Sequence, residues 1–428
     1  MKKKIVLIGL NLYSIFLALQ IRSKAKYDDI TIIEASNKFI NAFKSIKIKN
    51  YNVPPGFHTL ENIRSKKLIN FLSKEIKFKK ISKTRGLLIG KNLISYLNNY
   101  NQWPKNILSK FKIKKKKVKL NPLKNIKYLN KSYLRYLIDN YLGNDFSIED
   151  SISLTYPWFF PPNYNILSSD EGSLFNNDIR QKKIKHSFTF PEKGHFSEIS
   201  KALKVILKKK NIIVKLNKPI KFYKSKNNIF FEGDKILENR KAKKIICIPV
   251  KPLNDSIKNT INLPRLKPIK YFTGLIEVKN FIKSDLDKFC EIIVSSEFAF
   301  GLRRVFEYSD IFNLKNKKIY QFEFSEHSKE KDIDLQVDKI IGLLSNFISF
   351  KNQKNSQNIK LIGYSMVRNI FTPKQKHIDK ITSSTIKFFK NKNNIIFPRQ
   401  ITWPINSNKH LLYAQDDYTK KIAKFLND

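Results

Sequence analysis

The chain has 428 residues, which at about 150 residues per domain suggests roughly three units and allows a large core without metals or disulfides. With 41% hydrophobic and 13% aromatic residues it is too apolar for a disordered protein, and its two cysteines exclude a disulfide framework. The formal charge of +48 is unusual, and 72 of the 83 basic residues are lysine.

Three segments at the start of the chain predict a strand–helix–strand unit. Residues 4–9 and 29–34 are β-branched apolar runs, and residues 12–20 between them carry apolar side chains at helical spacing. Because this pattern fits within some 30 residues, the two strands should be parallel neighbours in one sheet. One alternative is that residues 5–21 form a hydrophobic leader after three lysines, although no small-residue cleavage site follows them.

Residues 59–162 offer four weaker patterns. An amphipathic helix is expected over residues 59–80 and another helix over 131–142. The lysine run at 112–119 is interpreted either as a solvated surface or as a specific anion site. The aromatic, proline-rich stretch at 157–162 cannot form a regular element.

The remainder mixes helices and strands, which predicts an α/β protein with an added α+β part. A helix beginning near Ser197, a second helix near position 332 and a closing helix are expected, and the segment 320–325 alternates as a half-buried strand. The expected helices span 197–208, 332–347 and 418–426, and the expected strands or extended segments span 212–216, 222–232, 243–249, 272–278, 291–294, 320–325 and 396–403.

The opening unit follows the logic of a dinucleotide-binding turn. In such a turn, backbone N–H groups and a helix N-terminus meet a pyrophosphate, and an acidic residue after the second strand holds a ribose hydroxyl. Gly9 and Glu34 fit the first glycine and the acidic residue. Asn11 and Ser14 stand where the G-x-G-x-x-G pattern has its other two glycines. The fold signal is therefore stronger than the binding signal.

The order of the motifs resembles that of the FAD-dependent amine-oxidase, protoporphyrinogen-oxidase and UDP-galactopyranose-mutase superfamily. The resemblance extends over most of the chain, and seven segments carry it. These are 33–36 (like "LE-A"), 56–58 (like "G-x-H"), 191–194 (like "P-x-x-G", before a helix and a strand), 244–249, 302–307 (like an "R-V" strand), 393–400 (like "N-L-x-x-x-G-R", with Pro398 in place of the glycine) and 416–418.

The resemblance implies a Rossmann-like FAD/NAD(P)-binding domain of the glutathione-reductase type with an inserted α+β substrate domain. The cofactor domain would comprise residues 1–78, 191–262 and 390–428, and the substrate or cap domain residues 79–190 and 263–389. FAD is the implied cofactor. Its expected contacts are Gly9, Asn11, Ser14, Glu34, Ala35, Gly56, His58, Ile220 (near adenine), Arg399 (at the flavin pyrophosphate) and Asp417 (at a helix start facing the flavin).

Substrate contacts are expected from Arg303 and Arg304, because arginine is scarce in this chain and makes bidentate contacts with carboxylates and phosphates. A contact is also expected from Tyr156, which could line a ring-binding pocket. Each expectation has an alternative. The arginines could instead form surface ion pairs with Glu307 or Asp310, and Tyr156, with Trp158 and Phe159, could pack in a core. The histidines His58 and His195 are candidate acids or bases or structural residues. No catalytic residue is assigned and no metal site is expected.

The expected function is that of an FAD-dependent oxidoreductase, amine-oxidase-like, or of a mutase-like flavoenzyme acting on a small or nucleotide-linked substrate. One alternative is a catalytically degenerate binding or scaffold protein that keeps the fold, as the missing glycines suggest. Another is a basic protein that binds nucleic acid or a membrane surface. The low arginine content argues against specific nucleic-acid recognition, and AT-rich codon usage would also explain the lysines. Peripheral contact with anionic surfaces stays open, and a cytoplasmic location is expected.

Overall fold

The computed structural model describes somewhat more than half of the chain. The described residues are 4–24, 27, 29–40, 45–54, 60–61, 69–89, 91–95, 188–193, 197–225, 228–238, 242–248, 268–295, 300–312, 314, 318–327, 330, 332–351, 358–371, 394–396 and 414–427. The elements expected at 112–119, 131–142 and 157–162 lie outside them.

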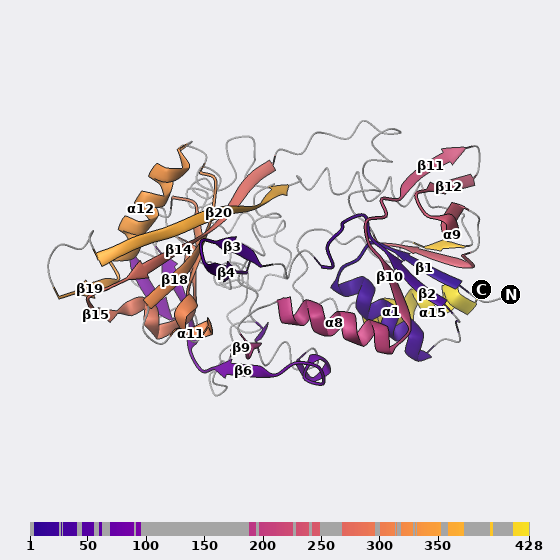
Figure 1. The fold of residues 1–428 in the computed structure, drawn as a ribbon, viewed down its shortest axis with the longest axis horizontal. Coiled ribbons are helices and arrows are strands. Elements are labelled where there is room, and N and C mark those ends of the chain that lie inside the picture. Colours follow the sequence, from indigo (N-terminus) through magenta and orange to yellow (C-terminus); the bar gives the residue numbers. More distant parts are fainter. Residues whose placement is uncertain are drawn as a thin grey trace, which may run out of the picture.

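The two ends of the chain lie beside a five-stranded parallel sheet (Figure 1). Its order is β10 (Ile212–Lys215), β2 (Asp29–Ile33), β1 (Lys4–Ile8), β13 (Lys244–Cys247) and β21 (Ile395–Ile396). The predicted strand–helix–strand unit is confirmed, because β1 and β2 pair in parallel and α1 (Leu12–Lys24) connects them. Strands β1 and β13 are buried on both faces, as their continuous apolar runs require.

This sheet forms the middle of three layers. Helices α1, α8 (Ser197–Lys209) and α15 (Ala423–Asn427) cover one face, together with the π-helical turn η8 (Tyr418–Ile422). The hairpin of β11 (Lys221–Ser225) and β12 (Asn228–Glu232) lies on the other side with the short helix α9 (Lys235–Glu238). Residues 5–21, weighed above as a hydrophobic leader, form the central strand and a buried helix of this core.

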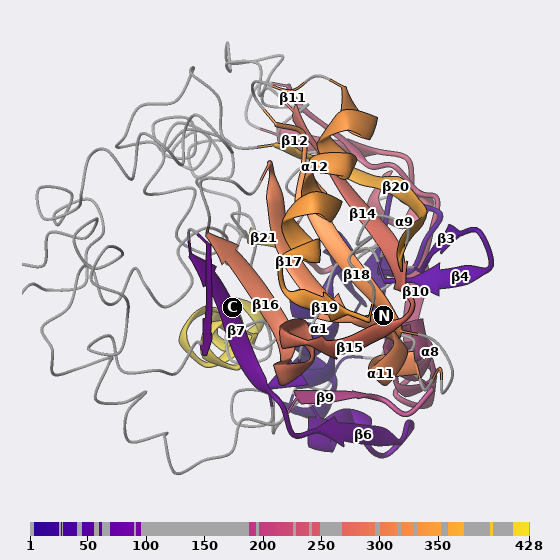
Figure 2. The same ribbon diagram turned by 90° about the vertical axis from the view of Figure 1, so that its left-hand side faces the viewer.

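A seven-stranded sheet forms the other end of the molecule (Figures 1 and 2). Its order is β20 (Ile359–Phe371), β14 (Pro268–Val278), β18 (Lys318–Ser325), β17 (Leu302–Glu307), β16 (Phe289–Ser295), β7 (Thr84–Ile89) and β8 (Asn92–Ser95). All neighbours are antiparallel except β16 and β7. Helix α12 (Ile333–Ser345) lies across one face, as Figure 2 shows.

Smaller elements complete the described structure. Helix α11 (Tyr308–Phe312) follows β17, the short 3₁₀ helix η6 (Asp285–Lys288) precedes β16, and β15 (Phe281–Ser284) pairs with β19 (Ile348–Phe350). A hairpin of β3 (Ile46–Ile48) and β4 (Tyr51–Val53) lies between the two large sheets in Figure 1. The domain boundaries expected from the sequence stay a prediction.

The single helix expected over residues 59–80 is wrong. The strand β5 (Leu60–Glu61) lies at the start of that range and the strand β6 (Phe78–Ile81) at its end. Both pair with β9 (Phe188–Pro191). Only residues 69–72 in its described part are helical. The predicted helix is therefore wrong at both of its described ends, which pair with a strand more than 100 residues further along the chain.

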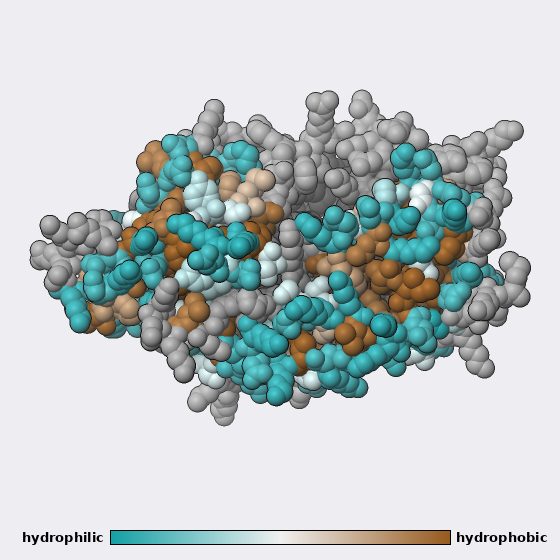
Figure 3. Space-filling model, in the orientation of Figure 1, coloured by the Kyte–Doolittle hydropathy of each residue, from teal (hydrophilic) through white to brown (hydrophobic). Residues whose placement is uncertain are grey.

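Polar and apolar side chains are unevenly spread on the surface. Figure 3 shows hydrophilic side chains along α8 and β6 and a hydrophobic area over the parallel-sheet part. Ile213 on the edge strand β10 is 50% exposed. Among the described helices, none is both long and apolar enough to cross a lipid bilayer.

Candidate functional site

The turn between β1 and α1 has the shape of a ligand-binding turn. Gly9 has a φ angle of +103°, which glycine adopts without the steric cost that other residues bear. Its N–H donates to the carbonyl oxygen of Ile33 at 2.8 Å, which ties the turn to the end of β2. The turn thus lies at the carboxyl ends of the parallel strands, where open α/β sheets bind ligands.

Glu34 places its carboxylate beside this turn. Its Oε2 accepts a hydrogen bond from the N–H of Leu10 at 2.7 Å, and its Oε1 accepts one from the N–H of Ser36 at 2.8 Å. The side chain is partly exposed and Ala35 is exposed. Since each carboxylate oxygen can accept a second hydrogen bond, Glu34 remains able to receive a ligand hydroxyl.

Asn11 and Ser14 are hydrogen-bonded to each other. The N–H of Ser14 donates to Oδ1 of Asn11 at 3.0 Å, and the N–H of Asn11 donates to Oγ of Ser14 at 2.9 Å. This reciprocal pattern is a capping box, which satisfies backbone donors at the start of a helix. Asn11 is partly exposed, whereas Ser14 is fully buried.

Asp417 and Ile220 are also described, and both side chains belong to the interior. The hydroxyl of Tyr13 donates to Oδ2 of Asp417 at 2.9 Å, and both residues are buried. This bond fastens the closing helical segment to α1. Ile220 is 3% exposed and packs in the core beneath the β11–β12 hairpin, with Ile33 among its neighbours. Its expected backbone contact with adenine stays a prediction.

The structure therefore brings Gly9, Asn11, Ser14 and Glu34 together at one end of the parallel sheet. Four further expected site residues lie outside the described residues. They are Gly56, His58, Tyr156 and Arg399, and the same holds for His195, Trp158 and Phe159.

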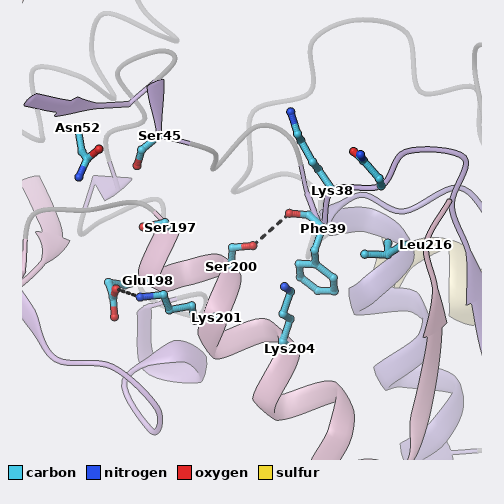
Figure 4. A pocket seen from close by; sticks show the side chains of 11 residues that line it. Lys38, Phe39, Ser45, Asn52, Ser197, Glu198, Ser200, Lys201, Lys204 and Leu216 are labelled. Atoms are coloured by element: carbon cyan, nitrogen blue, oxygen red, sulfur yellow. Dashed lines mark hydrogen bonds and ion pairs between the residues drawn. The ribbon is translucent and has the colours of Figure 1, made fainter. Parts of the chain in front are cut away.

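A cavity of about 620 Å³ opens between α8 and the loop after β2 (Figure 4). Oγ of Ser200 donates to the carbonyl oxygen of Phe39 at 3.2 Å, and Nζ of Lys204 lies 5.2 Å from the centre of the Phe39 ring. The cavity is lined by Asn37, Lys38, Phe39, Ser45, Asn52, Ser197, Glu198, Ser200, Lys201, Lys204 and Leu216. Its lining residues 37–39 follow Glu34 closely in the sequence. The lining carries more lysines than carboxylates, because Glu198 is its single acidic residue.

The seven-stranded sheet carries a second group of polar side chains, on the face opposite the Phe322 and Phe324 side of β18. The alternating residues Gln321, Glu323 and Ser325 are all at most 1% exposed. The strand expected at 320–325 is confirmed, but the expectation that it is half-buried is wrong, because β18 is a central strand whose polar face is covered as well. Buried polar groups are costly unless they are paired, so this face requires partners.

Glu323 is paired with Tyr271 on the neighbouring strand β14. The Tyr271 hydroxyl donates a short hydrogen bond to Oε2 of Glu323. Burial raises the pKa of the Tyr271 phenol, and the negative charge of Glu323 raises this pKa further, while Arg304 and Arg303 act in the opposite direction. Tyr271 therefore keeps its proton at neutral pH.

Both expected arginines of β17 lie near Tyr271, because the pairing of β17 with β18 shifts register between Leu302 and Arg304. The Arg303 guanidinium lies 5.6 Å from the centre of the Tyr271 ring, and Nη1 of Arg304 lies 3.2 Å from Oε1 of Glu291. Glu307 is one of the two surface partners considered for these arginines from the sequence. In the structure it pairs with Lys83 and Lys318. Arg303 itself is buried.

Gln321 links this face to the first half of the chain. Its Nε2 donates to the carbonyl oxygen of Pro54 at 3.0 Å and to Oγ1 of Thr273 at 2.8 Å. Its Oε1 and the Oγ of Ser325 are buried and have no hydrogen-bond partner among the described residues. Pro54 immediately precedes the segment that contains Gly56 and His58.

Sequence analysis missed Tyr271, Gln321, Glu323 and the cavity beside α8. A signal existed for β18, where polar residues alternate at positions 321, 323 and 325, but the same alternation is typical of a solvent-exposed face. The cavity joins residues 37–39 to 197–204, and no local pattern indicates that contact.

Comparisons with known proteins agree with this architecture. No family model matches the sequence, and no curated protein matches it. A reduced UDP-galactopyranose mutase superposes with a TM-score of 0.63 at 13% identity, covering 99% of this chain and 96% of that one. The chain therefore shares its overall fold with this mutase.

Two further structures extend the comparison. Wild-type putrescine oxidase bound to putrescine gives a TM-score of 0.56 at 10% identity, with 99% of each chain covered. An oxidoreductase from Methanosarcina mazei gives 0.55 at 11% identity, covering 97% of this chain and 100% of that one. At these identities the likeness concerns the fold. The resemblance inferred from the motif order is thus confirmed as a mixed α/β fold with a parallel sheet.

The residues present fit parts of the FAD that this fold implies. Gly9 provides the tight turn, and Glu34 provides the carboxylate for ribose hydroxyls. At the diphosphate position, the side chains of Asn11 and Ser14 accept hydrogen bonds from the backbone N–H groups that a phosphate would approach. A diphosphate at this position would have to compete with these two hydrogen bonds.

Proposed function

We propose that this chain is a flavin-dependent enzyme of the oxidoreductase or mutase type, acting on a small or nucleotide-linked substrate. The observation that carries the proposal is the pairing of Gly9, at a φ of +103°, with Glu34, whose carboxylate lies over the same turn. This arrangement places an acidic acceptor and a helix N-terminus at the carboxyl end of β1, as dinucleotide binding requires.

The polar face of the seven-stranded sheet is the proposed substrate side. Arg303 and Arg304 lie near the same tyrosine, and a guanidinium recognises carboxylates and phosphates in a bidentate manner. Gln321 contributes a buried amide oxygen that can accept a hydrogen bond from a substrate hydroxyl or amine. The face therefore suits a substrate that carries both an anionic group and hydrogen-bond donors.

The chain's own residues would bind and orient this substrate. When bound, a flavin supplies the redox or covalent chemistry. Tyr271 holds its proton on the phenol oxygen and directs it to Glu323, and Glu291 fixes the Arg304 guanidinium. These contacts keep the polar groups in place, and their burial strengthens their interaction with a charged substrate.

The test is a visible absorbance spectrum of the native protein, followed by the same spectrum after refolding with FAD. The proposal predicts a flavin spectrum in at least the second sample. A colourless protein that gains no flavin on refolding would contradict it.

A second candidate is a flavoprotein-fold binding or scaffold protein without catalysis. The hydrogen-bonded pair Asn11 and Ser14 favours it, because these side chains stand in for two glycines. Under this alternative, the variant Asn11→Gly/Ser14→Gly gains no flavin spectrum, whereas the proposed enzyme gains one.

A further inference from the structure

The two side chains that replace glycines at the turn act as one unit. Asn11 and Ser14 are three residues apart, and each side chain accepts a hydrogen bond from the other's backbone N–H. Ser14 also donates through Oγ to the carbonyl oxygen of Asn11 at 2.9 Å. The substitutions at the second and third glycine positions are therefore coupled: each is explained by the other.

The amides of this turn are consequently used within the chain. The N–H of Gly9 donates to Ile33 and the N–H of Leu10 donates to Glu34. The N–H groups of Asn11 and Ser14 donate to each other's side chains. In a dinucleotide-binding turn, backbone amides at this place approach a pyrophosphate.

The two members of the pair differ in their freedom to move. Ser14 is fully buried against the sheet, whereas Asn11 is partly exposed at the start of α1. An incoming diphosphate can therefore displace the Asn11 side chain outward but cannot displace Ser14. A phosphate that takes the Ser14 amide must first break the hydrogen bond from this amide to Oδ1 of Asn11.

We propose that the Asn11–Ser14 pair is an internal cap that occupies the diphosphate position and lowers the affinity of this chain for FAD. The proposal rests on the function proposed above. It predicts a flavin that exchanges readily and is lost during purification, with a ligand-free protein stabilised by its own side chains. Loss of one N-cap hydrogen bond corresponds to about tenfold in affinity.

The test is an equilibrium titration with FAD and with ADP, followed by flavin fluorescence and by calorimetry. It compares the wild type with Asn11→Gly and with Asn11→Gly/Ser14→Ala, which gives the accepted G-x-G-x-x-A pattern. Asn11→Gly should bind both probes about tenfold more tightly. Its ligand-free melting temperature should fall by only about a degree, because glycine is itself a tolerated N-cap.

Two control variants separate the cap from general stability. Asn11→Asp keeps an N-cap acceptor but adds a negative charge, so the protein should stay folded and bind FAD more weakly than the wild type. Asp332→Gly removes the N-cap of α12, whose Oδ1 accepts from the N–H groups of Asp334 and Leu335. This variant should lose about as much melting temperature as Asn11→Gly, about a degree, with unchanged FAD affinity.

The outcomes distinguish this inference from the proposed function. Tighter binding by Asn11→Gly with unchanged affinity in Asp332→Gly supports the internal cap. Equal FAD and ADP affinity in the wild type, Asn11→Gly and the double variant overturns the cap and leaves the proposed function standing. No binding by any folded variant overturns both.

Discussion

The two polar regions of this molecule satisfy their hydrogen bonds in opposite ways. At the turn of the parallel sheet, Asn11 and Glu34 are partly exposed and their polar atoms bond the chain's own backbone. On the seven-stranded sheet, Gln321 and Ser325 are fully buried, yet each keeps one oxygen without a partner among the described residues. In the partly exposed turn, these side chains accept hydrogen bonds from the backbone of the chain. The buried face keeps side-chain oxygens that can still form hydrogen bonds.

This difference indicates where each region gains its stability. A buried polar atom that lacks a partner is costly, and such atoms persist in native proteins chiefly where a ligand, water or function requires them. The turn, by contrast, is held in shape by hydrogen bonds within the chain, which need no ligand. The following substitutions test this contrast, beginning with the largest expected effect.

Arg304→Met should destabilise the protein most, because it leaves the carboxylate of fully buried Glu291 without its guanidinium. Breaking a buried ion pair on one side costs about 3 kcal/mol of unfolding free energy. Urea denaturation measures this loss. The double variant Arg304→Met/Glu291→Met should recover most of it, and equal losses in both variants would show that the pair is not the cause.

Gly9→Ala should cost about 2 kcal/mol, because a φ of +103° is strained for any residue with a Cβ atom. The variant should also fail to bind FAD, since the turn can no longer hold Leu10 against Glu34. Gly342→Ala is a matched control: this helical glycine has open space around it, and alanine there should stabilise by about 0.5 to 1 kcal/mol. Destabilisation of similar size in both variants would contradict a special role for Gly9.

Two buried serines allow the contrast between the regions to be measured directly. Ser14 and Ser325 are both fully buried, but Oγ of Ser14 is bonded to Asn11 while Oγ of Ser325 has no partner among the described residues. Ser14→Ala should cost about 1 kcal/mol, and Ser325→Ala should change the unfolding free energy by less than about 0.5 kcal/mol. The reverse order in chemical denaturation would refute the contrast.

Tyr364 gives the smallest expected effect, through pH. Its hydroxyl donates to Oδ1 of Asp334 at 2.8 Å, and this bond, followed by burial, raises the pKa of Tyr364 from 10.0 to about 12. Because the folded pKa is above the unfolded one, the stabilisation is complete below pH 10 and is lost as the pH rises toward 12. In Tyr364→Phe, denaturation measured across this window should show a shallower loss of stability, and an unchanged slope would contradict this.

The opening unit was predictable from sequence because its signals are local. Two β-branched runs with a helical pattern between them led to β1, α1 and β2, and the positions of Gly9 and Glu34 followed from spacing. The Asn11–Ser14 cap was also within reach, since residues three apart at a helix start form capping boxes. Considering these residues only as missing glycines concealed it.

Other features depend on contacts between distant segments. The strands at 60–61 and 78–81 pair with 188–191, so a helical pattern there misleads. Nothing local shows that the polar face of β18 is covered. The common neighbourhood of Arg303 and Arg304 results from a register shift in pairing, which no periodicity indicates.

A crystal structure of the protein grown with excess FAD tests the central claim most directly. We expect the ribose hydroxyls beside the Glu34 carboxylate, the diphosphate over the turn at Gly9, and the Asn11 side chain turned away from the N–H of Ser14. A fully occupied FAD bound elsewhere, or crystals without FAD in which Asn11 and Ser14 stay bonded at saturating cofactor, would contradict the account.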